Sequence, residues 1–107
     1  HTLEAMHAED VYAIGDTADV PTSKAGSVAH YEAGALADRL VSTLHGQVPT
    51  DRYGGKTICF IEAGMDEGTF IEFDYDRPPV PRPENKFIHW AKLAYNESYW
   101  LTARGHM

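Results

Sequence analysis

The first half of the chain contains two stretches whose apolar and polar positions predict secondary structure. Residues 11–16 are mainly apolar, with strand-forming side chains, and stop at Asp16. This pattern predicts a buried strand that ends in a carboxylate. In residues 27–45 apolar side chains recur at helical spacing, with Ser27 as the expected N-cap. We therefore expect one strand and one helix within residues 1–46.

The second half of the chain changes its periodicity twice. Residues 56–75 contain two β-branched and aromatic runs around a glycine-flanked turn, which predicts a β-hairpin. The proline-rich residues 77–83 are not expected to join a hydrogen-bonded ladder, so we expect an extended connector there. Residues 87–103 return to helical spacing and predict an amphipathic helix. The fold class is therefore α+β, and residues 47–107 form its second part.

Composition and charge narrow the classes of function. The chain has 107 residues, of which 43% are hydrophobic and 23% charged, as in globular proteins. Sixteen acidic against nine basic side chains give a net charge of −7, which argues against nucleic-acid binding. We find no apolar run of membrane-spanning length and no signal peptide, and expect a cytoplasmic or peripheral membrane protein. Because the chain starts without methionine or a leader, we interpret it as a fragment.

Four side chains could carry chemistry, and each also has a purely structural interpretation. Asp16 could accept hydrogen bonds from ribose or ribityl hydroxyls, or end an ordinary turn. Cys59 could be a redox thiol or a small core residue. Lys24, just before the expected helix, could face an anionic group or be exposed. Lys92, with histidine and tyrosine one turn away, could donate to a quinone carbonyl or extend along apolar surface.

Other titratable residues suggest no site. The six histidines have no spacing typical of metal ligands, so no metal site is expected. The single cysteine excludes a disulfide within the chain. Four carboxylates on the hairpin and just after it are expected to form a solvated face: Glu62, Glu72, Asp74 and Asp76.

Three segments together resemble the C-terminal part of the FAD-dependent pyridine nucleotide-disulfide oxidoreductases, and within them the sulfide:quinone oxidoreductases. They are residues 11–16, residues 23–26 at the start of a helix, and residues 59–64 with residues 89–95 downstream. The resemblance spans residues 2–100. The first segment by itself indicates only a flavin, whereas the others in this order are much more specific.

The resemblance implies that the first two segments bind FAD. Gly15 and Asp16 would lie at the ribityl chain of FAD, where the carboxylate binds hydroxyl groups. The flavin's pyrimidine edge would face the next segment, which also borders the quinone site: Lys24, Ala25 and Gly26.

The resemblance assigns the remaining residues to sulfur and quinone chemistry. Cys59 would be the second active-site cysteine, which pairs with a cysteine in an upstream part of the enzyme and carries sulfur. The quinone pocket would be lined by Phe60, Lys92 and Tyr95. Ser23 departs from the family motif, which usually has proline before the lysine.

The implied parent enzyme oxidises sulfide and passes two electrons through FAD to a quinone, and its C-terminal helix could contact the membrane surface. This chain has no GxGxxG motif and no partner cysteine, so alone it should be inactive and FAD-free. We expect its uncovered sheet edges and apolar helix to make it a homo-oligomer. The alternatives are a type II NADH:quinone dehydrogenase, a flavocytochrome c sulfide dehydrogenase, and a non-catalytic α+β interaction module.

Overall fold

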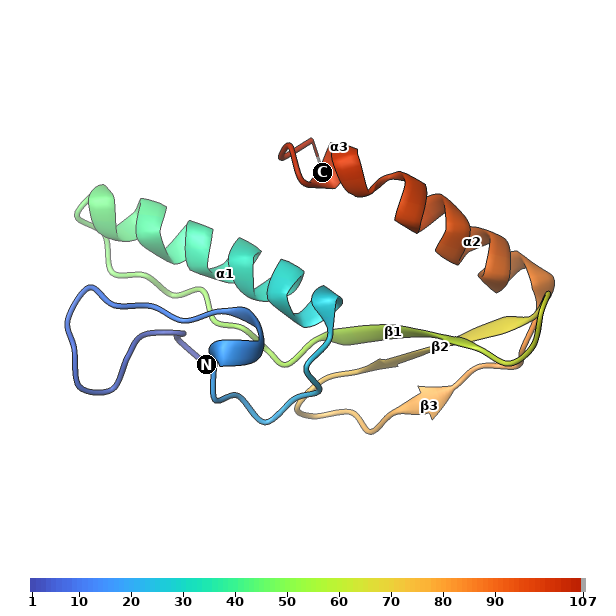
Figure 1. Ribbon diagram of the computed structural model, residues 1–107. Helices are drawn as coiled ribbons and strands as arrows, with labels where there is room; N and C mark the ends of the chain where they lie inside the picture. The colour runs from blue at the N-terminus through green and yellow to red at the C-terminus, as the bar shows by residue number, and fades with distance from the viewer. Residues whose placement is uncertain (107) are drawn as a thin grey trace. The chain divides into compact units, whose positions relative to one another are not determined.

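The fold was determined as a computed structural model that describes residues 1–106. Its helices and strands, in chain order, are η1 (Gly15–Thr17), α1 (Gly26–Leu44), β1 (Thr57–Glu62), β2 (Gly68–Phe73), β3 (Val80–Pro81), α2 (Lys86–Glu97) and α3 (Tyr99–Thr102) (Figure 1). The strands form one sheet in the order β1-β2-β3. This architecture confirms the predicted α+β class.

The chain divides into two compact units, which are described separately. Unit 1 consists of His1–Cys59 and Glu72–Pro79; unit 2 consists of Phe60–Ile71 and the chain from Val80 onward. Unit 1 has a small hydrophobic core in which Leu3, Val28 and Tyr53 are buried. Partly buried residues pack against them, among them Tyr31, Ala35 and Leu36 of α1 and Tyr75 after β2.

The strand predicted for residues 11–16 is not formed. Tyr12 makes only an isolated antiparallel bridge to Glu4, and the chain then turns into η1. Gly15 has a φ of +73°, which ends the extended path and which glycine adopts without a Cβ clash. The prediction was wrong because a strand needs a ladder of partners, and an apolar run does not supply them. Here the partner segment turns away as well, since Leu3 has a φ of 64°.

Helix α1 confirms the helix predicted for residues 27–45, but its expected cap was wrong. Ala25 is the N-cap and makes no side-chain capping bond. The Ser27 hydroxyl lies inside the first turn, where it donates to the Ile58 carbonyl oxygen at 2.6 Å and accepts from the Ile58 N–H at 3.1 Å. Because the hydroxyl makes both of these hydrogen bonds with the backbone of β1, it does not cap the helix. Ser27 therefore ties the start of α1 to β1.

The predicted hairpin is present, and the sheet extends one strand further than expected. β1 and β2 are joined by a turn in which the Ala63 N–H donates to the Glu67 carbonyl oxygen at 2.9 Å. Residues 77–83 were expected to stay outside the ladder, yet β3 lies within them, next to β2. That expectation was wrong because β3 is a short edge strand, the place where a sheet tolerates proline.

The C-terminal helix is interrupted. The helical stretch predicted for residues 87–103 is divided into α2 and α3 at Ser98. Asn85 caps α2, since its side-chain oxygen accepts the Ile88 N–H at 2.9 Å. Among residues 1–106, no helix has both the length and the apolar character needed to cross a bilayer.

Candidate functional site

The turn that carries Asp16 is fixed by a buried side chain of α1. The Gly15 N–H donates to Glu32 Oε2 at 2.6 Å, and Glu32 has an exposed fraction of 0%. A Cβ built on Gly15 would lie 3.6 Å from the Ala29 Cβ, so η1 packs closely on α1. Asp16, the next residue, is exposed. No local pattern indicates this role for Glu32, because Glu32 lies 17 positions along the chain from Gly15.

The segment from Lys24 to Gly26 leads into an open helix N-terminus. The Lys24 ammonium group donates to the Ala18 carbonyl oxygen, which closes the loop after η1. Around Gly26 no heavy atom lies within 4 Å of the position a Cβ would take, and the first turn of α1 contains no acidic residue. Free N–H groups at a helix N-terminus favour an electron-rich group. With the exposed carboxylate of Asp16, these residues fit the FAD-binding role that the resemblance implies.

Cys59 is a free thiol in β1 within unit 1, the unit that also contains Asp16 and Lys24. Its side chain is only partly buried. It directly follows Ile58, whose backbone groups are both bound by Ser27, so the strand is anchored to α1 one residue before the thiol. A partly accessible thiol on a held strand is available for chemistry, unlike a thiol sealed in a core.

The three residues predicted to line a quinone pocket all belong to unit 2. The rings of Phe60 and Tyr95 have their centroids 6.0 Å apart and are inclined by 36°. Phe70 lies on the β2 side of Phe60, at a centroid distance of 6.3 Å. The guanidinium carbon of Arg82 lies 4.6 Å from the centre of the Phe70 ring. Unit 2 therefore brings Phe60 and Tyr95 together in an aromatic cluster.

Glu62 links Lys92 to this cluster, although it was expected on a solvated face. Glu62 Oε1 lies 2.9 Å from Lys92 Nζ, and Glu62 Oε2 lies 3.0 Å from His89 Nδ1. The hydrogen bond from Lys92, followed by the contact with His89, lowers the pKa of Glu62 from its ordinary value of 4.5. The spacing of His89 and Lys92 in the sequence was a signal for a shared helical face. Nothing indicated their common partner 27 positions before His89.

The Glu62 cluster predicts a pH dependence for unit 2. A carboxyl group whose pKa is lower in the folded state stabilises the fold above its unfolded pKa, and the effect is lost as the pH falls through the folded pKa. We therefore expect the Glu62 contacts to stabilise unit 2 fully above pH 4.5, and this effect to be lost as the pH falls through the lower pKa of Glu62 in the folded state. Carbon NMR titration of the carboxyl group would measure this, and Lys92→Met should raise the pKa of Glu62. Lys86→Met, at the exposed start of α2, is the matched control. An unchanged titration in Lys92→Met would contradict the assignment.

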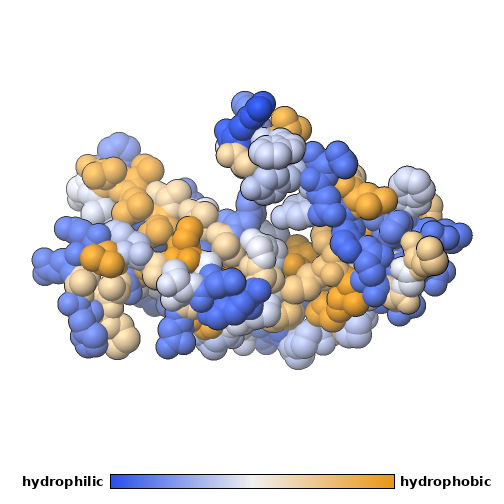
Figure 2. Space-filling model, viewed as in Figure 1, coloured by the Kyte–Doolittle hydropathy of each residue, from blue (hydrophilic) through white to orange (hydrophobic). Residues whose placement is uncertain are grey.

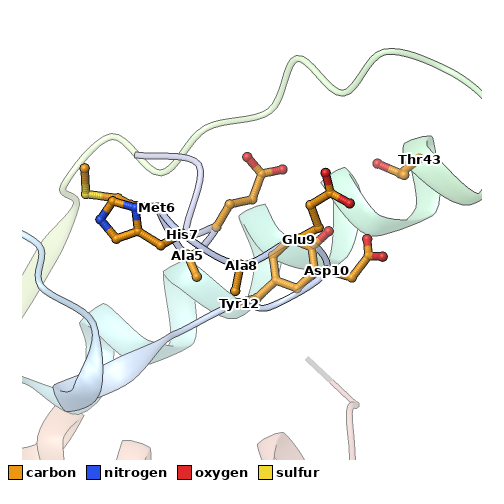
Figure 3. Close-up of a pocket in the computed structure, with 9 residues that line it drawn as sticks. Ala5, Met6, His7, Ala8, Glu9, Asp10, Tyr12 and Thr43 are labelled. Carbon is orange, nitrogen blue, oxygen red and sulfur yellow. The ribbon is translucent and has the colours of Figure 1, made fainter.

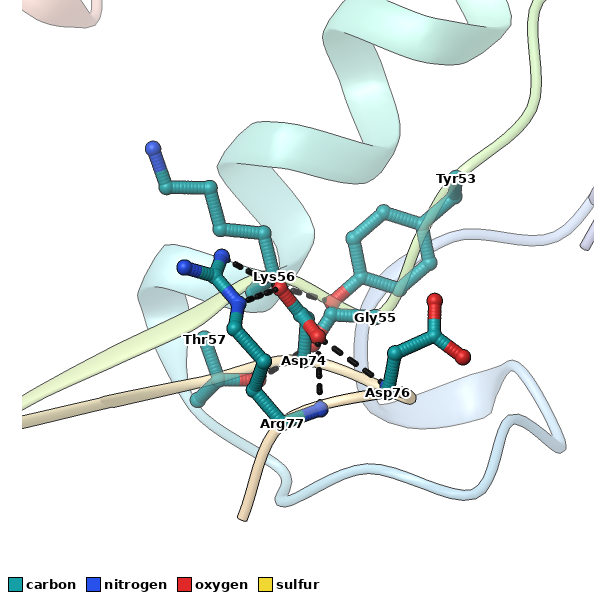
Figure 4. Close-up of polar contacts among 7 residues, drawn as sticks. All are labelled: Tyr53, Gly55, Lys56, Thr57, Asp74, Asp76 and Arg77. Atoms are coloured by element: carbon teal, nitrogen blue, oxygen red, sulfur yellow. Dashed lines mark hydrogen bonds and ion pairs between the residues drawn. The ribbon is translucent and has the colours of Figure 1, made fainter. Parts of the chain in front are cut away.

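Asp74 was also expected on a solvated face, but its carboxylate makes contacts with residues close to it in the chain (Figure 4). Its carboxylate accepts the backbone N–H groups of Asp76 at 3.0 Å and Arg77 at 2.9 Å, and it pairs with the Arg77 guanidinium. The guanidinium is the main cause of a lowered pKa for Asp74. Nearby, the Tyr53 hydroxyl donates to the Lys56 carbonyl oxygen at 2.9 Å. These contacts shape a turn and contain none of the predicted site residues.

A cavity of about 480 Å³ lies along the loop before Tyr12 (Figure 3). Its lining includes three acidic side chains, Glu4, Glu9 and Asp10. None of the predicted site residues is part of its lining. Within residues 1–106, no group of three or more histidine, cysteine, aspartate or glutamate side chains is placed to hold a metal ion. The predicted site residues therefore lie outside this cavity.

Comparison with known proteins identifies relatives over most of the chain. No protein-family model matches it. The mitochondrial sulfide:quinone oxidoreductase of Mus musculus is 30% identical over 79 residues, which is 74% of this chain and 18% of the relative. The enzymes of the same name from Schizosaccharomyces pombe and Dictyostelium discoideum are 27% and 30% identical, and each match covers 92% of this chain and 24% of the relative.

The chain thus spans 18–24% of the length of these relatives. The matches come from three different species and confirm the resemblance that the motifs indicated. Over most of its length, this chain is similar to a segment of the sulfide:quinone oxidoreductases.

Proposed function

We propose that this chain is the C-terminal part of a flavoprotein that oxidises sulfide and passes two electrons through FAD to a quinone. The observation that carries the proposal is the similarity to three sulfide:quinone oxidoreductases over as much as 92% of the chain. In this proposal residues 1–46 contribute to the FAD-binding domain. Residues 47–107 contribute the hairpin and the C-terminal helices.

The FAD-binding role falls to the surface of unit 1 around η1 and the start of α1. Asp16, exposed in η1, would accept hydrogen bonds from ribityl hydroxyls. The N-terminus of α1 at Gly26 would face the pyrimidine edge of the flavin, where negative charge develops on reduction. When bound, FAD supplies the two-electron redox step. Glu32, by holding the Gly15 N–H, would keep the carboxylate of the next residue in place.

In this proposal Cys59 carries the sulfur chemistry. In the proposed reaction, sulfide attacks a disulfide or polysulfide bridge between Cys59 and a cysteine elsewhere in the parent. A new sulfur–sulfur bond forms, and one cysteine leaves as a thiolate. The partly buried position of Cys59 supports this role, because a sulfur atom in the bridge must be accessible to sulfide.

In this proposal unit 2 contributes the residues that bind the quinone. The aromatic rings of Phe60 and Tyr95 would contact the flat quinone ring, and the Lys92 ammonium group would donate to one of its carbonyl oxygens. Lys92 keeps N–H groups for this purpose, because an ammonium has three donors and Glu62 takes one.

The exposed apolar surface of α2 and α3 supports a contact with a membrane surface or with a second copy of the chain. Hydrophobic side chains reach the surface over these helices (Figure 2). Large exposed side chains of this kind include Phe87, Trp90, Tyr99 and Trp100. Such residues are typical of helices that lie at the membrane interface. We propose peripheral membrane contact for the parent and homo-oligomer formation for the chain alone.

Anaerobic titration of the full-length protein with sulfide tests the proposed function. Sulfide should bleach the visible absorption of oxidised flavin, and a quinone should restore it in the absence of oxygen. The proposal would be overturned if the protein binds no flavin, or if its flavin is reduced by NADH but not by sulfide.

A further inference from the structure

We infer that Glu62 is a positioning residue for quinone reduction, which holds Lys92 and His89 beside the rings of Phe60 and Tyr95. This inference rests on the function proposed above. It assigns a role to Glu62 and His89, which lie in segments that carry the resemblance but to which the resemblance gives no role.

The geometry of β1 and α2 carries the inference. Phe60 and Glu62 are two positions apart in β1, so their side chains leave the same face of the strand. On α2, His89, Lys92 and Tyr95 follow one another at intervals of three residues and lie on one side of the helix. Contacts are made at both positions of the strand: the ring of Phe60 meets Tyr95, and the carboxylate of Glu62 binds the other two residues. The polar and aromatic contacts therefore form one continuous patch within unit 2.

The two oxygens of Glu62 have separate partners. Oε1 accepts from Lys92 Nζ at 2.9 Å, and Oε2 lies 3.0 Å from His89 Nδ1. Side chains here are accessible but not free in solvent, since 31% of the Glu62 side chain, 32% of Lys92 and 21% of His89 are exposed. A small polar ligand group can therefore reach them. One carboxylate thus restrains both neighbours in an accessible patch.

Restraint of Lys92 matters because a lysine ammonium ends a flexible four-carbon chain. Fixing one of its N–H groups on Glu62 directs the remaining donors and reduces the entropy lost when a carbonyl oxygen binds. Reduction of a quinone consumes two electrons, which the bound cofactor supplies, and two protons, which end on the two quinone oxygens. A donor already aimed at one oxygen stabilises the negative charge that grows there during the reaction.

The inference is tested by steady-state kinetics of the full-length protein with a water-soluble short-chain ubiquinone analogue. We expect Glu62→Gln to raise KM for the quinone about tenfold, because an amide forms a weaker hydrogen bond to an ammonium than a carboxylate does. Glu62→Asp keeps the carboxylate and should restore part of the loss. Flavin reduction by sulfide, measured without quinone, should keep its wild-type rate in both variants. Glu97→Gln, an exposed carboxylate on α2, is the matched control and should behave as wild type.

The outcomes separate the two proposals. Absence of sulfide-dependent flavin reduction in the wild type would overturn the proposed function itself. A second outcome is that the wild type is active and Lys92→Met raises KM for the quinone, whereas Glu62→Gln leaves it unchanged. That result would overturn the role of Glu62 and leave the proposed function standing. A purely structural role for Glu62 would slow the sulfide half-reaction and the quinone half-reaction alike, and that result also overturns the inference.

Discussion

Cys59→Ser should abolish sulfide-dependent quinone reduction by the full-length protein. We expect the rate to fall on the order of a thousandfold or more, because a serine hydroxyl forms no sulfur–sulfur bond and is not a thiolate nucleophile at neutral pH. Serine differs from cysteine in one atom. The Cys59 side chain is only partly buried, so the fold and the flavin content should be retained. The measurement is quinone reduction with sulfide as the electron donor, at equal flavin content.

The same variant distinguishes the alternative enzymes. A type II NADH:quinone dehydrogenase would not need Cys59, so unaffected NADH turnover, together with no activity toward sulfide, would contradict our proposal. A flavocytochrome c sulfide dehydrogenase would transfer electrons to a cytochrome and not to a quinone. In a non-catalytic module the thiol would be a core residue, and a thiol reagent would then fail to modify the folded chain. An undiminished sulfide-dependent rate in Cys59→Ser would exclude the proposed sulfur chemistry.

The elements that the sequence predicted well are those with local causes. Helix α1 has its apolar spacing and its terminal glycine within one stretch, and the hairpin has two β-rich runs around one turn. The prediction of a strand at residues 11–16 was wrong, because a ladder there would need a partner segment and that segment turns away at Leu3. Likewise, β3 was missed because its formation depends on a free edge of β2, which no pattern in residues 77–83 reveals.

The candidate site shows the same division between local and long-range causes. Motif positions such as Asp16, Cys59 and Lys92 could be named from the sequence, and their roles remain proposals. Their supporting partners could not be named, because each lies far along the chain: the Ser27 hydroxyl meets Ile58 across 31 positions. Glu32 reaches Gly15 from the second turn of α1, and its position in the sequence predicts no such contact. Residue chemistry predicts candidates, whereas their restraint depends on packing between distant segments.

Gly55→Ala should be the most destabilising single-methyl change in unit 1. Gly55 has a φ of +82°, and a Cβ at this position would overlap the ring of Tyr75. Both effects oppose alanine, since a left-handed backbone costs about 1–2 kcal/mol and overpacking about 1–3 kcal/mol. The ring cannot simply rotate away, because it packs edge-on against Tyr53, a buried core residue, with ring centroids 5.9 Å apart. We therefore expect the free energy of unfolding to fall by about 3 kcal/mol.

Gly54→Ala provides the matched control for this expectation. Gly54 itself does not have a positive φ, and no heavy atom lies within 4 Å of the Cβ that alanine would add there. Alanine there should change stability by less than about 1 kcal/mol, since it removes only backbone freedom from the unfolded state. Urea unfolding followed by circular dichroism, at one protein concentration, compares the two variants. Equal stabilities would contradict the close approach of Tyr75. In a Tyr75→Leu background, Gly55→Ala should lower the free energy of unfolding by less than it does in the wild type. The reason is that the steric part of its penalty depends on the Tyr75 ring.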